Sequence, residues 1–165
     1  MVPTTKEMQR AELHKTIWRI ANDLRGSVDG WDFKTYVLGM MFYRFISENL
    51  TDYINEGEWR AGDTDFNYCN LSNADAKDIF EEMVTEKGFF IFPSDLFVNV
   101  RARAAQDENL NETLEGVFRN IEGSAAGTPS ERDLKGLFAD LDVNSPRLGA
   151  TVAQRNQKLV KVLDA

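Results

Sequence analysis

The segment over residues 30–55 constrains the fold more than any other part of this sequence. Apolar residues recur through it at helical spacing, and they cover most of the helix circumference instead of a single stripe: Phe33, Tyr36, Val37, Met40, Met41, Phe42, Phe45 and Ile46. A helix that is apolar nearly all round has to be enclosed, so we expect it at the centre of the fold. Gly39 costs it about 1 kcal/mol of propensity relative to Ala, which the close approach of a neighbouring helix would offset.

Shorter periodic segments predict further helices around the central one. We expect them over residues 5–25, 74–87, 94–104, 109–121, 128–138 and 147–163. Gly26 and Gly88 are placed to end two of them, because glycine adopts the left-handed conformation that follows many helices. Ser94 is expected to cap the helix that follows it, and Thr128-Pro-Ser-Glu131 has the pattern of a capping box.

Residues 88–93 differ from the rest because they are aromatic and are bounded by glycine and proline. This pattern favours a short β-strand or hairpin. Residues 56–74 are polar and aperiodic, and they predict a long loop. The expected fold class is therefore all-α, a mainly helical bundle with one small β element near residues 88–93. We expect residues 1–165 to form a single domain.

The charge of the chain is distributed unevenly. The formal net charge is −8, and residues 51–88 hold ten acidic but only three basic residues. Such acidity argues against nucleic acid as a partner of the middle of the chain, although both ends can still present basic surface. The candidates for contacts with DNA phosphates are Lys34, Arg44, Arg101 and Arg103. Each of these is more often a surface residue in an ion pair than a ligand of a DNA phosphate.

The residue inventory excludes several kinds of site. One cysteine, Cys69, rules out an internal disulfide, and one histidine, His14, rules out a metal site built on several histidines. No apolar run approaches the roughly 20 residues that a membrane helix needs, so we expect a soluble, cytoplasmic protein.

Catalytic and cofactor motifs are also missing from the sequence. It has no Gly-rich phosphate loop, no Gly-x-Gly after a predicted strand and no Asn-Pro-Pro segment, since its four prolines are isolated. We therefore predict no catalytic residue, no cofactor-binding residue and no metal ligand in these 165 residues.

Two acidic runs, residues 63–67 and 140–144, match the first three ligand positions of an EF-hand loop. The sixth and twelfth positions, which need Gly and Glu, are Tyr68 and Ala74 in the first run and Ser145 and Thr151 in the second. A calcium role is therefore disfavoured.

The aromatic residues Phe89, Phe90 and Phe92 raise the possibility of base stacking. Stacking platforms interleave such rings with Lys or Arg, which residues 88–92 lack. The sequence therefore favours core filling for these rings.

Three segments together carry a family resemblance: residues 10–50, 87–97 and 133–152. The most specific part reads LRGSV at residues 24–28, YVLG at 36–39 and FIS at 45–47. In order and spacing the segments resemble the N-terminal region of the modification (HsdM) subunits of type I restriction-modification systems.

This resemblance implies a function that composition does not show. The parent protein would methylate the exocyclic amino group of adenine in DNA, with S-adenosylmethionine as its cofactor. It would assemble with a second modification subunit, a specificity subunit and motor-nuclease subunits. The cofactor and catalytic motifs of the family would follow residue 165, so this part of the protein is expected to be inactive alone. Its role would be to help assemble the complex and close it around double-stranded DNA, through weak phosphate contacts.

A function of another class is also compatible with the sequence. The same helices suit a free-standing protein-interaction module with no link to methylation. A Gly-rich strand-turn segment encoded after residue 165, followed by an Asn-Pro-Pro-aromatic motif, would decide for the methyltransferase.

Overall fold

The computed structural model describes residues 5, 6, 8, 30–139 and 141–164, and all regular structure in this part of the chain is helical. The elements are α2 (Gly30–Arg60), η1 (Tyr68–Asn70), α3 (Asn73–Ala76), η2 (Lys77–Ile79), α4 (Phe80–Lys87), η3 (Pro93–Asp95), α5 (Phe97–Arg103), η4 (Ala104–Gln106), α6 (Leu110–Ser124), α7 (Glu131–Ala139), η5 (Pro146–Leu148) and α8 (Val152–Asp164). The predicted all-α class is confirmed. The predicted helix over residues 5–25 lies almost entirely outside the described residues.

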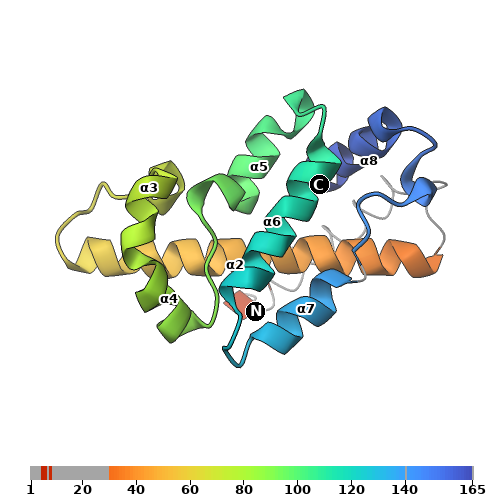
Figure 1. The fold of residues 1–165 in the computed structure, drawn as a ribbon. Coiled ribbons are helices and arrows are strands. Elements are labelled where there is room, and N and C mark those ends of the chain that lie inside the picture. Colours follow the sequence, from red (N-terminus) through yellow and green to blue (C-terminus); the bar gives the residue numbers. More distant parts are fainter. Residues whose placement is uncertain (1–4, 7, 9–29, 140, 165) are drawn as a thin grey trace, which may run out of the picture.

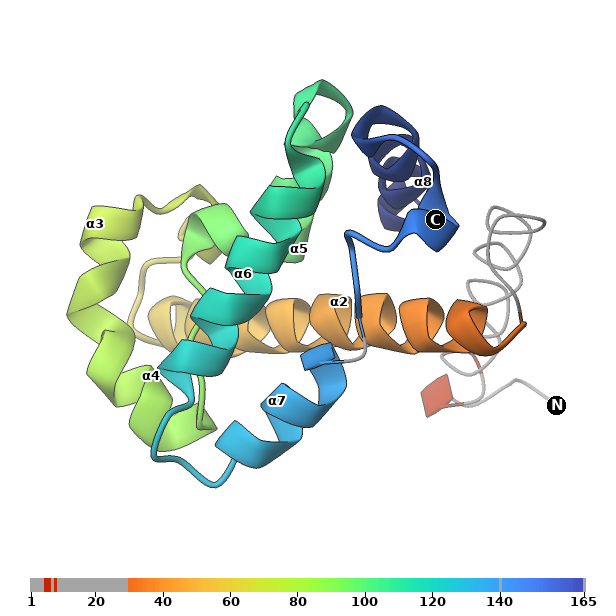
Figure 2. The same cartoon turned by 45° about the vertical axis from the view of Figure 1, so that its right-hand side comes forward.

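Helix α2 forms the axis of the molecule, as predicted, but its apolar circumference is enclosed only in part, because Leu38 and Phe45 are 52% and 63% exposed. It spans 31 residues and crosses the whole structure, with α3 and α4 beside its C-terminal half and α5 to α8 arranged around the rest (Figures 1 and 2). Its side chains Tyr36, Met40, Tyr43 and Leu50 are almost completely buried. Among the described helices, none combines the length and apolarity that crossing a membrane requires.

Tyr43 is the point at which several helices meet. Its ring lies 5.4 Å from the ring of Phe97 on α5 and 5.4 Å from that of Phe118 on α6, both in edge-to-face geometry. Phe118 in turn stacks on Phe138 of α7 with centroids 4.5 Å apart. Aromatic pairs of this kind contribute roughly 0.5–1.5 kcal/mol each beyond the area they bury. This chain of rings ties α2, α5, α6 and α7 into one core.

Gly39 permits the close approach that its position predicts. A Cβ atom added there would lie 3.0 Å from one methyl group of Leu141 and 3.1 Å from the other. Leu141 belongs to the segment after α7 and is itself buried. The partner is therefore a side chain of a connecting segment, whereas the sequence predicts a neighbouring helix.

The prediction of a β element near residues 88–93 is wrong. The backbone N–H of Phe90 donates to Ser124 Oγ at 2.8 Å, and Phe90 C=O lies 3.0 Å from the same hydroxyl. The Tyr68 hydroxyl donates to the carbonyl oxygen of Ile91 at 2.6 Å. Side chains from α6 and η1 thus satisfy polar groups that a second strand would otherwise pair. The segment is aromatic because it is buried.

Some helix boundaries also differ from the predicted ones. Helix α2 continues to Arg60, although its last turn is exposed to solvent and has no apolar stripe from which a helix could be predicted. Glu56 and Arg60 pair across this turn at 3.8 Å, which favours the helical conformation. Ser94 lies in η3 and does not cap α5; Ser47 of α2 accepts the hydrogen bond from the Phe97 N–H at 3.2 Å. Gly88, with a φ of +87°, ends α4 as predicted.

The two C-terminal helices begin later than expected. The predicted box at residues 128–131 forms a turn, and Glu131 Oε2 accepts from the Gly127 N–H at 3.1 Å just as α7 begins. A reciprocal cap precedes α8, where Gln154 N–H donates to Thr151 Oγ1 and Thr151 N–H donates to Gln154 Oε1, each at 3.2 Å. This cap explains why α8 starts at Val152.

Replacing Ser124 by Ala tests how residues 88–92 are held. The substitution leaves the buried N–H of Phe90 without its acceptor, so we expect a loss of about 1–3 kcal/mol in the free energy of unfolding. Urea denaturation followed by circular dichroism measures the change. Thr85→Ala is the control, because the Thr85 hydroxyl is exposed and bonds only the Glu81 carbonyl of its own helix. Equal effects of the two substitutions would contradict this account.

Candidate interaction surfaces

The predicted phosphate contacts fall on two helices that pack together. Arg44 lies on α2, and Arg101 and Arg103 lie on α5. The Arg44 guanidinium sits 5.6 Å from the centre of the Phe97 ring at the start of α5, so these two helices are in contact beside it. Lys34 belongs to α2, and its side chain lies outside the described part of the structure.

Each of the three described arginines has a partner within the chain. Arg44 Nε donates to Glu48 Oε1 at 2.8 Å, and Arg101 Nε faces Asp164 Oδ1 at 3.4 Å. The side chains of Arg44 and Arg101 remain 43% and 45% exposed. Arg103 Nη2 donates at 2.7 Å to a neutral acceptor, the carbonyl oxygen of Ser94. Exposed pairs of this kind are worth about 0–1 kcal/mol, so they can exchange for another anion at little cost.

The buried hydroxyls and the thiol are held in their neutral forms. Burial raises the pKa of Tyr43 well above its usual value, and burial also raises the pKa of Tyr68. Burial likewise raises the pKa of Cys69, although a hydrogen bond between its sulfur and Thr51 opposes the shift. Groups that stay protonated at neutral pH are poor nucleophiles and poor general bases. His14 lies outside the described residues.

The two calcium-like runs serve as local caps and loop contacts. In the first, Asn67 Oδ1 accepts from the Cys69 N–H at 3.1 Å and caps η1. In the second, Asp142 Oδ1 accepts from the Asn144 N–H at 2.9 Å. Within the described part of the chain, no three His, Cys, Asp or Glu side chains are grouped as a metal ion would require.

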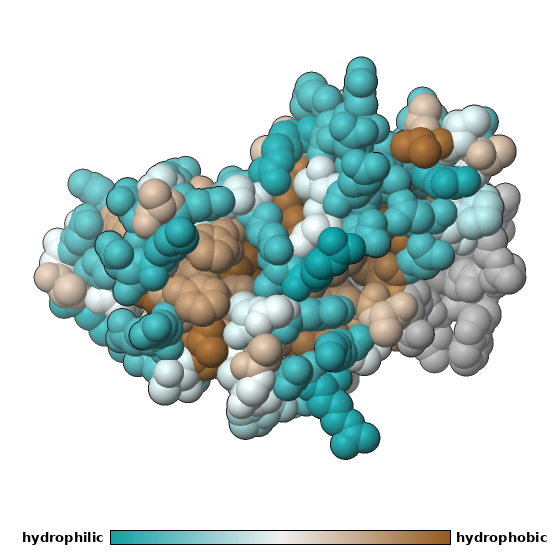
Figure 3. All heavy atoms as spheres, in the orientation of Figure 1, coloured by the Kyte–Doolittle hydropathy of each residue, from teal (hydrophilic) through white to brown (hydrophobic). Residues whose placement is uncertain are grey.

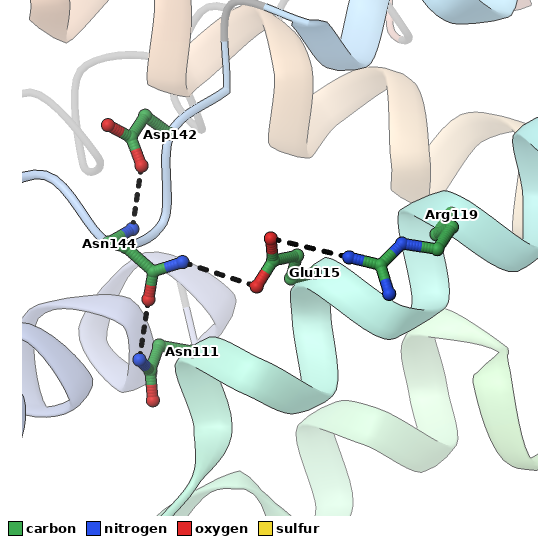
Figure 4. A network of polar contacts seen from close by, with 5 residues as sticks. All are labelled: Asn111, Glu115, Arg119, Asp142 and Asn144. Atoms are coloured by element: carbon green, nitrogen blue, oxygen red, sulfur yellow. Dashed lines mark hydrogen bonds and ion pairs between the residues drawn. The ribbon is translucent and has the colours of Figure 1, made fainter.

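Asn144 is the centre of a polar network between α6 and the segment after α7 (Figure 4). Its Oδ1 accepts from Asn111 Nδ2 at 2.6 Å, and its Nδ2 donates to Glu115 Oε2 at 3.3 Å. Glu115 also pairs with Arg119 at 3.5 Å. Glu115, Arg119 and Asn144 border a hollow of about 380 Å³ together with the stacked Phe118 and Phe138 rings. The network fixes the segment after α7 on α6, and in doing so holds Leu141 against Gly39.

A second hollow of about 500 Å³ lies between the C-terminal half of α2 and the η2–α4 segment. We call it the α2–α4 groove. It is lined by Tyr53, Ile54, Glu56, Gly57, Glu58 and Arg60 from α2, and by Ile79, Glu82, Met83 and Glu86 from η2 and α4. The sequence does not reveal this groove, because its pattern predicts a loop over residues 56–60. The sequence signal that could have indicated the groove is the spacing of three and four residues between its lining residues in both segments.

The aromatic cluster around residues 89–92 packs on itself. Phe90 is 5.2 Å from Phe80 and 5.0 Å from Phe92, and both Phe89 and Phe90 are buried. Figure 3 shows the corresponding view of the surface as mainly hydrophilic, with one apolar patch in the seam between α3–α4 and α6 and smaller ones on the other side of α6 and near α8. This burial favours the core-filling interpretation over base stacking.

Comparison with known proteins gives consistent matches. Residues 13–165 match the family described as the HsdM N-terminal domain. The chain is 44% identical over 162 residues to the Type I restriction enzyme MpnII methylase subunit of Mycoplasma pneumoniae, covering 94% of this chain and 30% of that protein. It also resembles the crystal structure of the type I restriction-modification system methyltransferase subunit from Streptococcus thermophilus. That match has a TM-score of 0.73 and 26% identity, and it covers 93% of this chain and 33% of the other. The chain thus spans about a third of the length of each relative.

The thiol of Cys69 offers a direct test of the local environment. Because its pKa is raised, less of it is thiolate at pH 8 than in a free cysteine, which has a pKa of about 8.5. We expect its reaction with a disulfide reagent to be slower than that of a cysteine-containing peptide, and its rate to rise at higher pH. Absorbance of the released thiol measures both rates. A pH profile with a midpoint below that of the peptide would contradict the stated environment.

Proposed function

The chain belongs to the HsdM N-terminal domain family, and from this premise we propose that it is a non-catalytic part of a type I restriction-modification DNA adenine methyltransferase subunit. In this role it helps the subunit assemble with its partners and close around DNA. The observation that carries the proposal is the family match over residues 13–165.

We propose that S-adenosylmethionine, the cofactor of the proposed reaction, is not bound by the described helices. Nucleotide-type cofactors are held at a turn between a strand and a helix, and the described part of the chain contains no strand. We therefore propose that the rest of the full-length subunit binds S-adenosylmethionine and carries the chemistry. The chain spans only 30% of its Mycoplasma relative, which leaves ample length for such a domain.

The proposed partners are a specificity subunit, a second modification subunit and the motor-nuclease subunit of the same system, together with double-stranded DNA. The α2–α5 surface is the proposed DNA-facing side, because it carries Arg44, Arg101 and Arg103. Phosphate contacts of this kind position a protein on the duplex and read no sequence. The alternative of a free-standing interaction module has less support, since the 44% identity is to a protein named as a methylase subunit.

Titration calorimetry tests which part of the subunit binds the cofactor. We expect the 165-residue chain to show no binding of S-adenosylmethionine, and the full-length subunit to bind it. We also expect a full-length subunit lacking this domain to keep the cofactor site, while it loses assembly with the specificity subunit or affinity for DNA. A tight, stoichiometric cofactor site on the isolated chain would sink the proposal, as would normal assembly and DNA affinity without the domain.

Replacing Lys34, Arg44, Arg101 and Arg103 by Ala in the complete assembly tests the DNA-facing surface. Affinity should fall to a similar degree for specific and non-specific duplexes, because phosphate contacts are independent of sequence. The salt dependence should become shallower by about 0.9 in the log–log slope for each phosphate that the variant no longer neutralises. Fluorescence anisotropy at several salt concentrations measures both quantities.

A variant that removes negative instead of positive charges from this surface provides the control. Glu48→Gln and Asp164→Asn remove the carboxylates that face Arg44 and Arg101 while keeping the size of each side chain. We expect this pair of substitutions to strengthen non-specific DNA binding and to change the free energy of unfolding by less than about 1 kcal/mol. If neither the alanine set nor this pair alters affinity, the DNA contact lies on another surface.

A further inference from the structure

The α2–α4 groove has the geometry of a seat for a third helix. Helix α2 contributes Tyr53, Glu56, Gly57 and Arg60, and the η2–α4 segment contributes Ile79, Glu82, Met83 and Glu86. Both sets follow the spacing i, i+3, i+4 and i+7, which places each set on one face of its helix. Two such faces side by side form the kind of groove in which an amphipathic helix lays its apolar side.

The floor of the groove is apolar. Ile54 and Met83 are buried at its base, Ile79 is half-buried, and Tyr53 is 40% exposed, with Lys87 Nζ 4.7 Å from the centre of its ring. Gly57 adds open space, because a Cβ atom built there meets no heavy atom within 4 Å. A glycine inside a helix destabilises the helix relative to alanine. Nothing within the described chain occupies the space that it leaves.

The rim of the groove is acidic. Glu56, Glu58, Glu82 and Glu86 all line it, and the single basic lining residue, Arg60, lies 3.8 Å from Glu56. Glu82 and Glu58 have no ion pair shorter than 4 Å among the described residues, whereas Glu86 accepts a hydrogen bond from the Tyr53 hydroxyl. A negative rim repels nucleic-acid phosphates and attracts Lys and Arg side chains.

We propose that the α2–α4 groove is a docking site for a basic amphipathic helix of a partner protein. Leucine, isoleucine or methionine side chains of that helix contact Ile79 and Met83, and its lysine or arginine side chains pair with the glutamates of the rim. The backbone of the helix approaches α2 at Gly57. This site rests on the assembly role in the proposed function and is separate from its DNA-facing surface, because it lies away from the α2–α5 arginines.

The probe is a fluorescent synthetic peptide of about 18 residues, roughly five helical turns, built from leucine and lysine at helical spacing. A second peptide with glutamate in place of each lysine is the charge control. Anisotropy titrations with the 165-residue chain should show saturable binding of the lysine peptide and none of the glutamate peptide. Equal binding of the two peptides, or no binding of the lysine peptide, would overturn the proposal.

Charge-matched variants separate the groove from the general acidity of the chain. Glu58→Gln with Glu82→Gln removes two charges from the rim and should weaken binding about fivefold. Glu112→Gln with Asp133→Asn removes two exposed charges on α6 and α7, outside the groove, and should change binding less than about twofold. Equal weakening by the two pairs would mean that the peptide binds through net charge alone.

A shape-matched pair tests the position of the helix. Gly57→Leu fills the groove and should weaken peptide binding at least about tenfold, while its higher helix propensity keeps the chain folded. Gly116→Leu is the control, since Gly116 on α6 also has open space around its Cβ position and does not line the groove. Circular dichroism checks folding. If either leucine variant fails to fold, the two charge-matched pairs decide whether the peptide binds in the groove. Unchanged binding by Gly57→Leu would remove the groove as the site.

Discussion

The enclosure of α2 is the constraint on which the rest of this structure depends. A helix with apolar side chains on nearly all sides is unfavourable in water unless other elements surround it. The rings of Tyr43, Phe97, Phe118 and Phe138 accomplish this by joining α2, α5, α6 and α7 through face and edge contacts. Leu141 packs over Gly39, and the Asn144 network holds the segment that carries it, whereas Leu38 and Phe45 of α2 remain 52% and 63% exposed.

The sequence predicts the elements whose signal lies in the chain itself. The central helix, the stop at Gly88 and the all-α class follow from periodicity and glycine conformation, and the structure confirms them. The resemblance to HsdM subunits is likewise confirmed by the family match. It rests on particular residues in order, such as those of residues 36–39, and not on composition.

Other features depend on partners distant in the sequence. Residues 88–93 have the composition of a strand, and only the positions of Ser124 and Tyr68 show that hydroxyl groups replace a second strand. The α2–α4 groove needs residues 56–60 to be helical, although they lack an apolar stripe. The partner of Arg101 is invisible in the sequence for the same reason, since Asp164 lies 63 residues from it, whereas Arg44 and Glu48 have the i, i+4 spacing that favours an ion pair on a helix. Whether those arginines contact DNA stays a prediction.

Charge divides the molecule into two regions with different chemistry. The arginines of α2 and α5 lie beside Phe97, whereas residues 51–88 concentrate the acidic side chains around the C-terminal half of α2 and α4. The proposed contacts with DNA and with other subunits would benefit from this arrangement, because each surface repels the other's ligand. The same rigid helix carries both regions, so their relative orientation is fixed by α2.

The central position of α2 also bears on how the protein is made. Tyr36 of α2 donates a hydrogen bond to the Asp142 carbonyl, 106 residues later in the chain. At synthesis rates of about 5–20 residues per second, this part of the apolar helix leaves the ribosome roughly 5–20 s before the segment around Asp142 that packs against it. During that interval it exposes a surface suited to aggregation or to binding by chaperones. Placing the most apolar helix early in the chain therefore makes folding wait for translation.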